Sequence, residues 1–334
     1  MKISEDQIRP KEMIQDYYRL CDKDSRAFFP IVNRRQVGCP CCLKGHDRSE
    51  ELFEKSSFSY VRCRECLSIY VSPRPSGQDL ERYYCDGESV KFWVDRLFKE
   101  TMQSRIELTV KPKVELLLDR LDLKSEAGPY HFIDIGAGMG FLLEVLKERM
   151  GERHTYSAIE PHSGFASELS LRNINIIPDF IEKVVGEDVS KFESSSMSRI
   201  FISNELIEHL LEPEVFFNKV RGLMKPGDYF NFTGLCGSGF DIQYLLEESA
   251  ALIPPHHLTF FSRAALIKML TNNKFCNIDF ETPGKLDVEI VRKSKKFRQD
   301  RLLQQLINDD TSQSFQEFLC ENKLSSHMNV ICQA

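Results

Sequence analysis

A glycine-rich turn with an acidic residue in front of it is the segment of this sequence best suited to chemistry. Phe132–Gly140 reads FIDIGAGMG, and Asp134 stands two residues before the first glycine, Gly136. Glycines in such a turn let the backbone approach a ligand without a Cβ in the way. The turn lies between an apolar run and an amphipathic helical pattern, which is where an open α/β sheet binds a nucleotide cofactor. We therefore expect a cofactor site here.

The details of this turn favour a cationic cofactor over a dinucleotide. The dinucleotide fingerprint requires glycine at its sixth position, where this chain has Phe141. The carboxylate of Asp134 would also repel a pyrophosphate, whereas S-adenosylmethionine (SAM) carries an ammonium and a sulfonium and no phosphate. Glu160, at the end of the next predicted strand, could accept hydrogen bonds from both hydroxyls of a ribose. The alternative is that Asp134 caps a turn and Glu160 is a surface acid.

Two cysteine pairs have the spacing of metal ligands. Cys39–Cys42 reads CPCC, Cys63–Cys66 reads CREC, and twenty residues separate the two pairs. Each pair can place two thiolates on one tight turn, and two such turns complete the four-sulfur shell that Zn²⁺ prefers. A zinc ribbon of this size does not fold without its metal, so we predict structural zinc bound by Cys39, Cys42, Cys63 and Cys66. Cys41, Cys85 and His46 are alternative ligands, and neither pair has the strand–helix context of a redox site.

Carboxylates and histidines form two further clusters after predicted strands. Ile200–Leu210 contains an E-x-x-E-H pattern, and Pro254–Ser262 reads PPHHLTFFS. Segments that follow the strands of an open parallel sheet meet around the same crevice. The side chains that we expect there are Glu205, Glu208, His209, His256 and His257.

These side chains suit three different roles. His257 could be the base that removes a proton from the acceptor of a methyl group, because the ordinary pKa of histidine lies near neutrality. Glu205, Glu208, His209 and His257 also have the ligand types for a divalent ion. The third hypothesis is structural. Glu208 and His209 stabilise the loop against the following helix, and His257 is a hydrogen-bonded core histidine.

The elements that would position these residues alternate between residues 128 and 292. Short apolar runs are separated by helical patterns, which predicts an α/β fold with a mostly parallel sheet covered on both faces. The predicted strands are Tyr130–Ile135, Tyr156–Ile159, Ile174–Ile177, Arg199–Ser203, Tyr229–Thr233, Phe275–Glu281 and Asp287–Val291. The predicted helices between them are Phe141–Met150, Gly164–Arg172, Pro213–Leu223 and Arg263–Thr271.

From about residue 110 to 292 the chain resembles the class I SAM-dependent methyltransferases. The glycine loop, Ile200–Leu210 and the turn Leu223–Asp228 match motifs of that family, although Asp228 replaces a glycine. The resemblance implies a Rossmann-like sheet whose last strand is antiparallel, with Glu160 at the ribose and Asp179 and Phe180 near the adenine. The implied SAM-binding residues are Asp134, Gly136, Ala137, Gly138, Gly140, Glu160, Pro161, Asp179, Phe180 and Asn204.

The segment Cys39–Tyr84 resembles the N-terminal zinc ribbon of bacterial methyltransferases in sugar and surface-polysaccharide pathways. That resemblance implies that the ribbon helps to close a substrate cleft and that Tyr83 and Tyr84 face the substrate. The alternative is that both are core tyrosines of a linker helix.

The histidine segment has its own resemblances. HHLTFFS is similar to the HEHLSYFS stretch of nucleotide-sugar C-methyltransferases, whose last histidine is the base; His257 matches it, and His256 stands where a glutamate is expected. The E-x-x-E-H pattern is similar to that of ubiquinone-pathway O-methyltransferases and small-RNA 2′-O-methyltransferases, which hold a metal there.

Composition and charge limit the classes of partner and cellular location that we expect for this protein. The chain of 334 residues has a net charge of −6. This charge disfavours nucleic-acid binding, because binding to a phosphate backbone depends on clustered lysine and arginine side chains. The first residues have no apolar core and no run of 18 apolar residues occurs, so we expect a cytoplasmic protein without a membrane span. The expected organisation is a helical segment (1–37), the ribbon (38–77), a helical linker (78–127), the SAM-binding domain (128–292) and a helical tail (293–334).

The favoured expectation is an enzyme that methylates an oxygen or carbon of a sugar or related small molecule. A metal-assisted O-methyltransferase acting on RNA or a phenol is the second, and a SAM-binding scaffold without turnover is the third. The sequence leaves open which atom is methylated and how many chains assemble.

Overall fold

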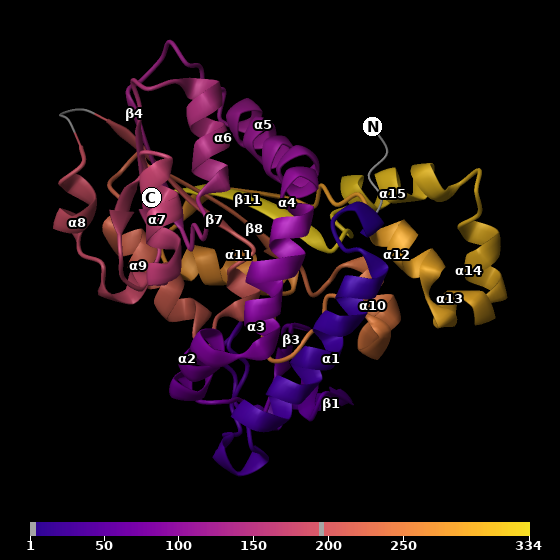
Figure 1. The fold of residues 1–334 in the computed structure, drawn as a ribbon. Helices are drawn as coiled ribbons and strands as arrows, with labels where there is room; N and C mark the ends of the chain where they lie inside the picture. The colour runs from indigo at the N-terminus through magenta and orange to yellow at the C-terminus, as the bar shows by residue number, and fades with distance from the viewer. Residues whose placement is uncertain (1–4, 194–196) are drawn as a thin grey trace.

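A seven-stranded sheet forms the centre of the protein. The computed structural model describes residues 5–193 and 197–334 (Figure 1). The strand order is β10-β11-β8-β7-β4-β5-β6. The bounds are Tyr130–Ile135 (β4), Thr155–Ile159 (β5), Asn175–Ile177 (β6), Ser198–Asn204 (β7), Tyr229–Leu235 (β8), Cys276–Glu281 (β10) and His327–Gln333 (β11). Strands β4 to β8 pair in parallel, whereas β11 is antiparallel to both β8 and β10. This confirms the expected class I methyltransferase sheet.

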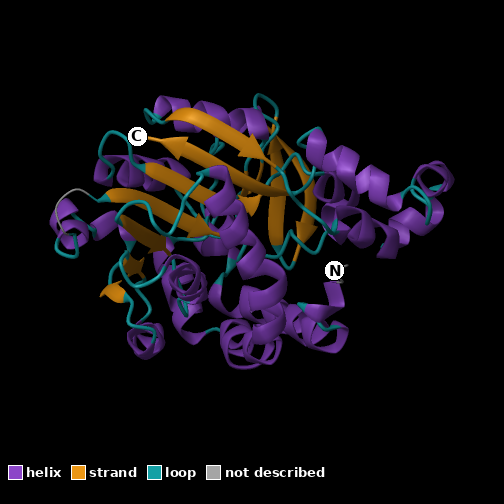
Figure 2. Cartoon of the chain, turned by 90° about the horizontal axis from the view of Figure 1, so that it is seen from above, coloured by secondary structure: helices purple, strands orange, loops and turns teal. Residues whose placement is uncertain are grey.

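Helices cover both faces of this sheet (Figure 2). The alternation of side chains along a strand explains the two cores: Phe132 of β4 packs on one face and Ile133 on the other. The first face is covered by α5 (Lys111–Arg120), α6 (Phe141–Met150) and α7 (Ala166–Leu171). The second face is covered by α8 (Gly186–Ser190), α9 (Pro213–Leu223) and α11 (Arg263–Asn272). Ser262 caps α11 by accepting a hydrogen bond from the amide of Ala265.

A second, smaller sheet joins the cysteine-rich segment to the histidine segment. Its order is β1-β2-β3-β9, with bounds Ser49–Lys55, Phe58–Cys63, Ile69–Val71 and Thr259–Phe260. The pairing of β3 with β9 is antiparallel, with Ile69 opposite Phe260. The strand β9 begins two residues after His257, so the small sheet is built partly from a segment far along the chain from the cysteines.

The N-terminal helices gather at the end of the molecule where the small sheet lies (Figure 1). They are α1 (Lys11–Phe28), α2 (Gly77–Asp86) and α3 (Glu88–Phe92), and α3 runs on through α4 (Lys99–Arg105) into α5. Two π-helical turns, Trp93–Phe98 and Ile106–Val110, interrupt this run. None of the described helices combines the length and apolar character needed to cross a lipid bilayer.

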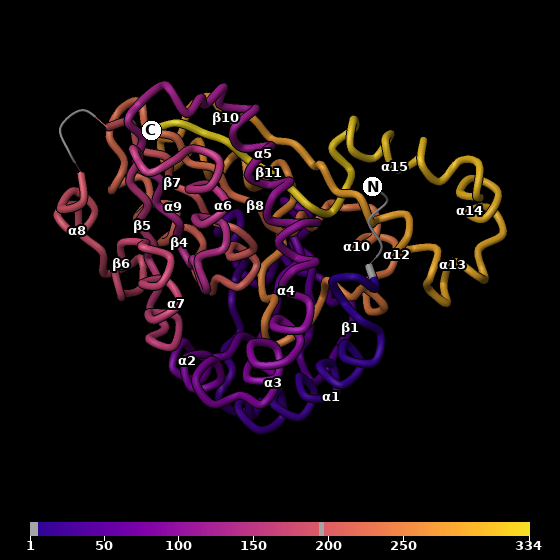
Figure 3. The backbone as a smooth tube through the Cα atoms, turned by 45° about the horizontal axis from the view of Figure 1, so that its top comes forward, coloured from indigo at the N-terminus to yellow at the C-terminus, as the bar shows by residue number. Residues whose placement is uncertain are grey.

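The C-terminal residues correct one sequence prediction. The segment expected as a strand at Asp287–Val291 is instead the helix α12 (Asp287–Lys293), whose buried Val288 and Val291 have helical spacing. The strand that completes the sheet is β11, from the segment that was expected to be a helical tail. Between them, α13 (Lys295–Gln299), α14 (Arg301–Leu306) and α15 (Ser312–Glu321) project to one side, next to α10 (Phe240–Leu245) (Figure 3).

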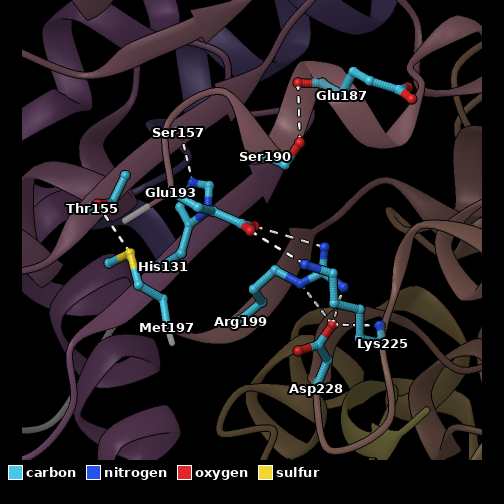
Figure 4. A network of polar contacts seen from close by, with 10 residues as sticks. All are labelled: His131, Thr155, Ser157, Glu187, Ser190, Glu193, Met197, Arg199, Lys225 and Asp228. Atoms are coloured by element: carbon cyan, nitrogen blue, oxygen red, sulfur yellow. Dashed lines mark hydrogen bonds and ion pairs between the residues drawn. The ribbon is translucent and has the colours of Figure 1, made fainter. Parts of the chain in front are cut away.

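A buried ion-pair network lies at the N-terminal end of strand β7 (Figure 4). Arg199, at the start of β7, is 2% exposed and donates to the Asp228 carboxylate at 2.8 Å. Asp228 also accepts from the amide of Lys225, and Glu193 lies 3.7 Å from Arg199. Asp228, which replaces a glycine of the family turn, therefore neutralises a buried arginine.

Candidate functional site

The glycine loop joins β4 to α6. Gly140 has φ +80°, which favours glycine, and a Cβ on it would lie 2.5 Å from a terminal methyl carbon of Leu169, which would have to shift. Gly138 also has a positive φ, and the space beside it is open. The turn therefore keeps its backbone accessible on one side and packed on the other.

This loop lines a cavity of about 290 Å³. Asp134 enters it from the end of β4, with only 3% of its surface exposed. Burial and, to a smaller extent, the charge of Glu160 raise the pKa of Asp134 to about 7, although Lys113 opposes the shift. A buried acid with such a pKa is poised to ionise against a cationic ligand. The other lining residues are Trp93, Val94, Phe98, Thr109, Val110, Lys113, Gly136, Ala137, Gly138, Met139, Phe141, Leu142, Phe165 and Asn204.

Several of these lining residues are absent from the sequence predictions. Trp93, Phe98, Thr109 and Val110 come from the two π-helical turns, which often occur at functional sites. Lys113 donates a hydrogen bond to Glu205 at 2.8 Å. In the sequence, only the apolar residues of this helical stretch indicate that it could pack over the glycine loop.

Glu160 lies behind the glycine loop rather than among the residues that line the cavity. Its Oε2 accepts from the amide of Gly138 at 2.8 Å, and its Oε1 accepts from the amide of His162 at 2.9 Å. Each carboxylate oxygen has a second lone pair, so ribose hydroxyls could still bind. The three other residues predicted for the nucleoside lie beyond β5 and β6, outside the cavity lining: Pro161, Asp179 and Phe180, the last being 46% exposed.

Asn204 ends β7 at the cavity. Its Oδ1 accepts from the hydroxyl of Thr233 at 2.9 Å, and its Nδ2 is buried with no hydrogen-bond partner among the described residues. Buried amide donors without partners are costly, so a ligand in the cavity with an acceptor at this position would be stabilised.

Glu205 and Glu208 follow Asn204 but have different surroundings. Glu205 adopts φ +51° and forms an ion pair with Lys113. Burial would raise the pKa of Glu205, but the charges of Lys113 and His327 and the hydrogen bonds that it accepts hold it well below its usual range. Glu208 is 1% exposed, and its Oε2 has no hydrogen-bond partner among the described residues. Burial, followed by the charge of Glu205, raises the pKa of Glu208 to about 8.

The structure brings Glu208, His209 and His257 together. One potential ligand atom from each lies within 4.8 Å of the others, and Glu205 is not in this group. The His209 and His257 rings are 4.8 Å apart and nearly perpendicular. The amide of Leu258 donates to the carbonyl of Glu208 at 2.8 Å, which fixes the two segments to each other. Glu208, His209 and His257, with the ring of His256 beside His209, therefore form one cluster, and Glu205 lies outside it.

The hydrogen bond of His257 defines its chemistry. Its Nδ1 lies 2.5 Å from the carbonyl oxygen of Ala251, which can only accept, so Nδ1 carries the proton and Nε2 keeps a lone pair. Burial lowers the pKa of His257 to about 4. The ring is therefore neutral at pH 7, with one nitrogen able to accept a proton or bind a metal.

Tyr83 and Tyr84 both contact the histidine cluster from α2. The hydroxyl of Tyr84 lies 3.2 Å from Nδ1 of His209, and the hydroxyl of Tyr83 is hydrogen-bonded to Nε2 of His256. Burial lowers the pKa of His256 to about 3. The prediction that these tyrosines face a substrate remains a prediction, but their hydroxyls do reach the cluster.

The four predicted zinc ligands converge. Cys39 Sγ lies 3.6 Å from Cys66 Sγ, and Cys42 Sγ lies 3.5 Å from Cys63 Sγ. These distances are too long for a disulfide at about 2.05 Å. They approach the sulfur–sulfur edge of about 3.8 Å in a tetrahedral shell with Zn–S bonds of about 2.3 Å. The donor set therefore fits zinc.

The two cysteine turns repeat one backbone pattern. Leu43 and Leu67, each just after a cysteine pair, both have φ +62°. In each turn the leucine amide donates to the carbonyl of the first cysteine, Cys39 or Cys63, at 2.9 Å. Cys41 is outside the four-thiol group that the described residues form, so it does not replace Cys42.

The cysteine ribbon holds the histidine segment directly. The hydroxyl of Tyr60 donates to the carbonyl of His257 at 2.9 Å. Arg74 is 4% exposed and donates to the carbonyl of Leu258 at 2.9 Å. The hydroxyl of Ser262 donates to the carbonyl of Cys66. A change in the ribbon would therefore reach the histidines through hydrogen bonds.

Comparison with known proteins gives similar folds among solved structures. No model of a protein family and no curated relative matches the chain. A SAM-dependent methyltransferase from Thermotoga maritima, described as a possible histamine N-methyltransferase, is 12% identical with a TM-score of 0.44 over 77% of this chain and 94% of its own. The plantazolicin methyltransferase BamL, bound to a triazolic analog and SAH, is 14% identical with a TM-score of 0.47 over 76% and 93%. A SAM-dependent methyltransferase from Archaeoglobus fulgidus is 16% identical with a TM-score of 0.42 over 67% and 94%.

The fold is that of the class I methyltransferases. The assignment follows from the strand order of the large sheet, with β11 antiparallel between β8 and β10.

Proposed function

We propose that the protein is a SAM-dependent methyltransferase that transfers a methyl group to an oxygen or carbon of a sugar or related small molecule. The observation that carries the proposal is the buried carboxylate of Asp134, which faces a cavity bordered by the glycine loop of a class I methyltransferase sheet. The sugar-type acceptor rests on the sequence resemblance of the ribbon and of the HHLTFFS segment alone.

The residues of the cavity suit the binding of SAM. When bound, SAM supplies a methyl group activated by its sulfonium. Asp134 would neutralise the ammonium, and Nδ2 of Asn204 would donate a hydrogen bond to an acceptor atom of the cofactor. Trp93 and Phe98 would exclude water from above the loop.

The histidine cluster suits the removal of a proton from the acceptor. Nε2 of His257 holds a lone pair, and the hydrogen bonds to Ala251 and Tyr60 fix the position of the residue. In this reading His257 takes the proton of an acceptor hydroxyl, while His209 and His256 border the same space. Zinc, held by the four cysteines in a closed shell, would be structural.

SAM binding is expected to strengthen as the pH rises, because a cationic ligand prefers the ionised form of Asp134. With a pKa of about 7, Asp134 is almost fully protonated at pH 5.5 and about half ionised at pH 7.0. The affinity for SAM should therefore increase roughly tenfold between these two pH values. Calorimetric titration with SAM at these pH values measures the change. Asp134→Asn should bind weakly at every pH, whereas Asp119→Asn, an exposed change on α5, should behave like the wild type. The absence of SAM binding by the wild-type protein contradicts the proposed function.

A metal-assisted methyltransferase is the second candidate. Glu208, His209 and His257 supply the two-histidine, one-carboxylate set of catalytic zinc sites, and Oε2 of Glu208 lacks a partner among the described residues. Elemental analysis after incubation with Mn²⁺ and dialysis should then find a second metal besides zinc. Glu208→Gln should remove the second metal, and Glu212→Gln, an exposed neighbour, should retain it. A single zinc per chain and no other metal, with turnover unaffected by Mg²⁺ or Mn²⁺, excludes this candidate.

A further inference from the structure

A row of buried polar groups connects the N-terminal helix α1 to the histidine cluster. Asp24 of α1 is 2% exposed, and its Oδ2 accepts from both the amide and the hydroxyl of Ser89, each at 2.7 Å. The Ser89 hydroxyl lies 2.8 Å from the hydroxyl of Tyr83. The Tyr83 hydroxyl in turn contacts Nε2 of His256. The row thus runs from a carboxylate to an imidazole.

The carboxylate fixes the direction of every hydrogen bond in this row. An ionised carboxylate can only accept, so the single hydroxyl proton of Ser89 is donated to Asp24. Ser89 must then accept from Tyr83, whose only hydroxyl proton is used in that bond. The oxygen of Tyr83 can therefore only accept from His256, which requires a proton on Nε2 of His256. The neutral ring then has its lone pair on Nδ1.

The same helix also packs against the ring of His256. Tyr17 stacks on it with a centroid distance of 5.7 Å. Tyr17, Cys21 and Asp24 are buried at the spacing of one helical face. Residues of α1 therefore contact His256 both directly and through the row, which gives the N-terminal segment a connection to the site.

We propose that Asp24 is a positioning residue that holds His256 in the Nε2–H tautomer through Ser89 and Tyr83. The adjacent His257 is held in the opposite tautomer by Ala251. The lone-pair nitrogens of this cluster would then be Nδ1 of His256 and Nε2 of His257. This arrangement favours acceptors that present hydroxyl donors, as sugars do, over carboxylate or phosphate groups, and that part of the inference rests on the proposed methyltransferase.

Exchanging the carboxylate for an amide tests the direction of the row. In Asp24→Asn the side-chain amide can donate to Ser89, so each bond can reverse and Tyr83 can donate to Nε2 of His256. The ¹⁵N chemical shifts of the labelled histidine should show Nε2–H in the wild type and a shift towards Nδ1–H in the variant. Turnover should fall roughly tenfold or more, as for a histidine in the wrong tautomer, with SAM affinity unchanged.

Controls separate this role from a structural one. Asp22→Asn lies on the same helix, where Asp22 pairs with Arg26 at the surface, and should alter neither the spectrum nor turnover. Tyr83→Phe removes the acceptor for Nε2–H and should produce a mixture of both tautomers, which provides a second test if Asp24→Asn does not fold. A wild-type His256 with its lone pair on Nε2, or a tautomer unchanged in a folded Asp24→Asn variant, overturns the proposal. Both spectra are independent of SAM binding, so failure of the proposed function would be recognised separately.

Discussion

Replacement of Cys63 by serine is expected to abolish turnover while SAM still binds. Loss of one thiolate opens the four-sulfur shell, and a zinc ribbon without its metal does not stay folded, so we expect turnover to fall by at least ~10²-fold. The cofactor cavity should be spared because its lining begins at Trp93 and contains no residue of the ribbon.

The small sheet connects the ribbon to the histidines, so unfolding of the ribbon would disturb the histidines. Strand β3 pairs with β9, and β9 follows His257 by a single residue. The hydrogen bonds from Tyr60 to His257 and from Arg74 to Leu258 would be lost when the ribbon unfolds. The histidines would then lose their fixed distance from the cofactor, and alignment of the reacting groups is a large part of catalysis in a direct displacement.

Three measurements on one preparation test this prediction: zinc content by elemental analysis, SAM affinity by calorimetry, and turnover. Cys85→Ser is the matched control, because Cys85 is an exposed cysteine on α2 outside the four-thiol group. Removal of zinc from the wild type by a chelator, followed by its return, should reverse the loss. Full turnover by a zinc-free Cys63→Ser protein would show that the ribbon does not position the histidines.

Features with local signals could be predicted from the sequence. The glycine loop needs positive φ at Gly136, Gly138 and Gly140, and that need is visible in the residue types. The cysteine pairs are likewise local, because each turn is closed by bonds within a few residues. The strands β4 and β7 are short apolar runs buried on both sides of the sheet, which gives them a clear pattern.

Features that depend on distant partners could not be predicted. Lys113 and Glu205 are far apart in sequence, and nothing in either segment indicates that they form an ion pair. Asp24 reads as one more acid on an amphipathic helix, yet its partner is Ser89. The strand β11 enters the sheet between β8 and β10 after a helical excursion, so its apolar run gives no indication of its neighbours.

The substitution His257→Ala is expected to lower turnover by about 10²-fold, the lower range of the contribution of a general base. The affinity for SAM should change little, because His257 does not line the cavity of Asp134. His46→Ala, the removal of an exposed histidine of the ribbon that lies outside the four-thiol group, should leave both quantities unchanged.

The pH dependence of turnover distinguishes a base from a packing residue. A base must be unprotonated, and burial lowers the pKa of His257 to about 4. With SAM held at a saturating concentration at every pH, so that protonation of Asp134 does not limit the rate, the wild-type rate should therefore stay level as the pH falls through the ordinary histidine range near 6.5 and decline only near the lowered pKa. The residual rate of His257→Ala should lack that decline, because the group that titrates is gone. If the variant keeps the wild-type rate, or loses rate only together with thermal stability and SAM affinity, His257 holds the loop in place and another group receives the proton.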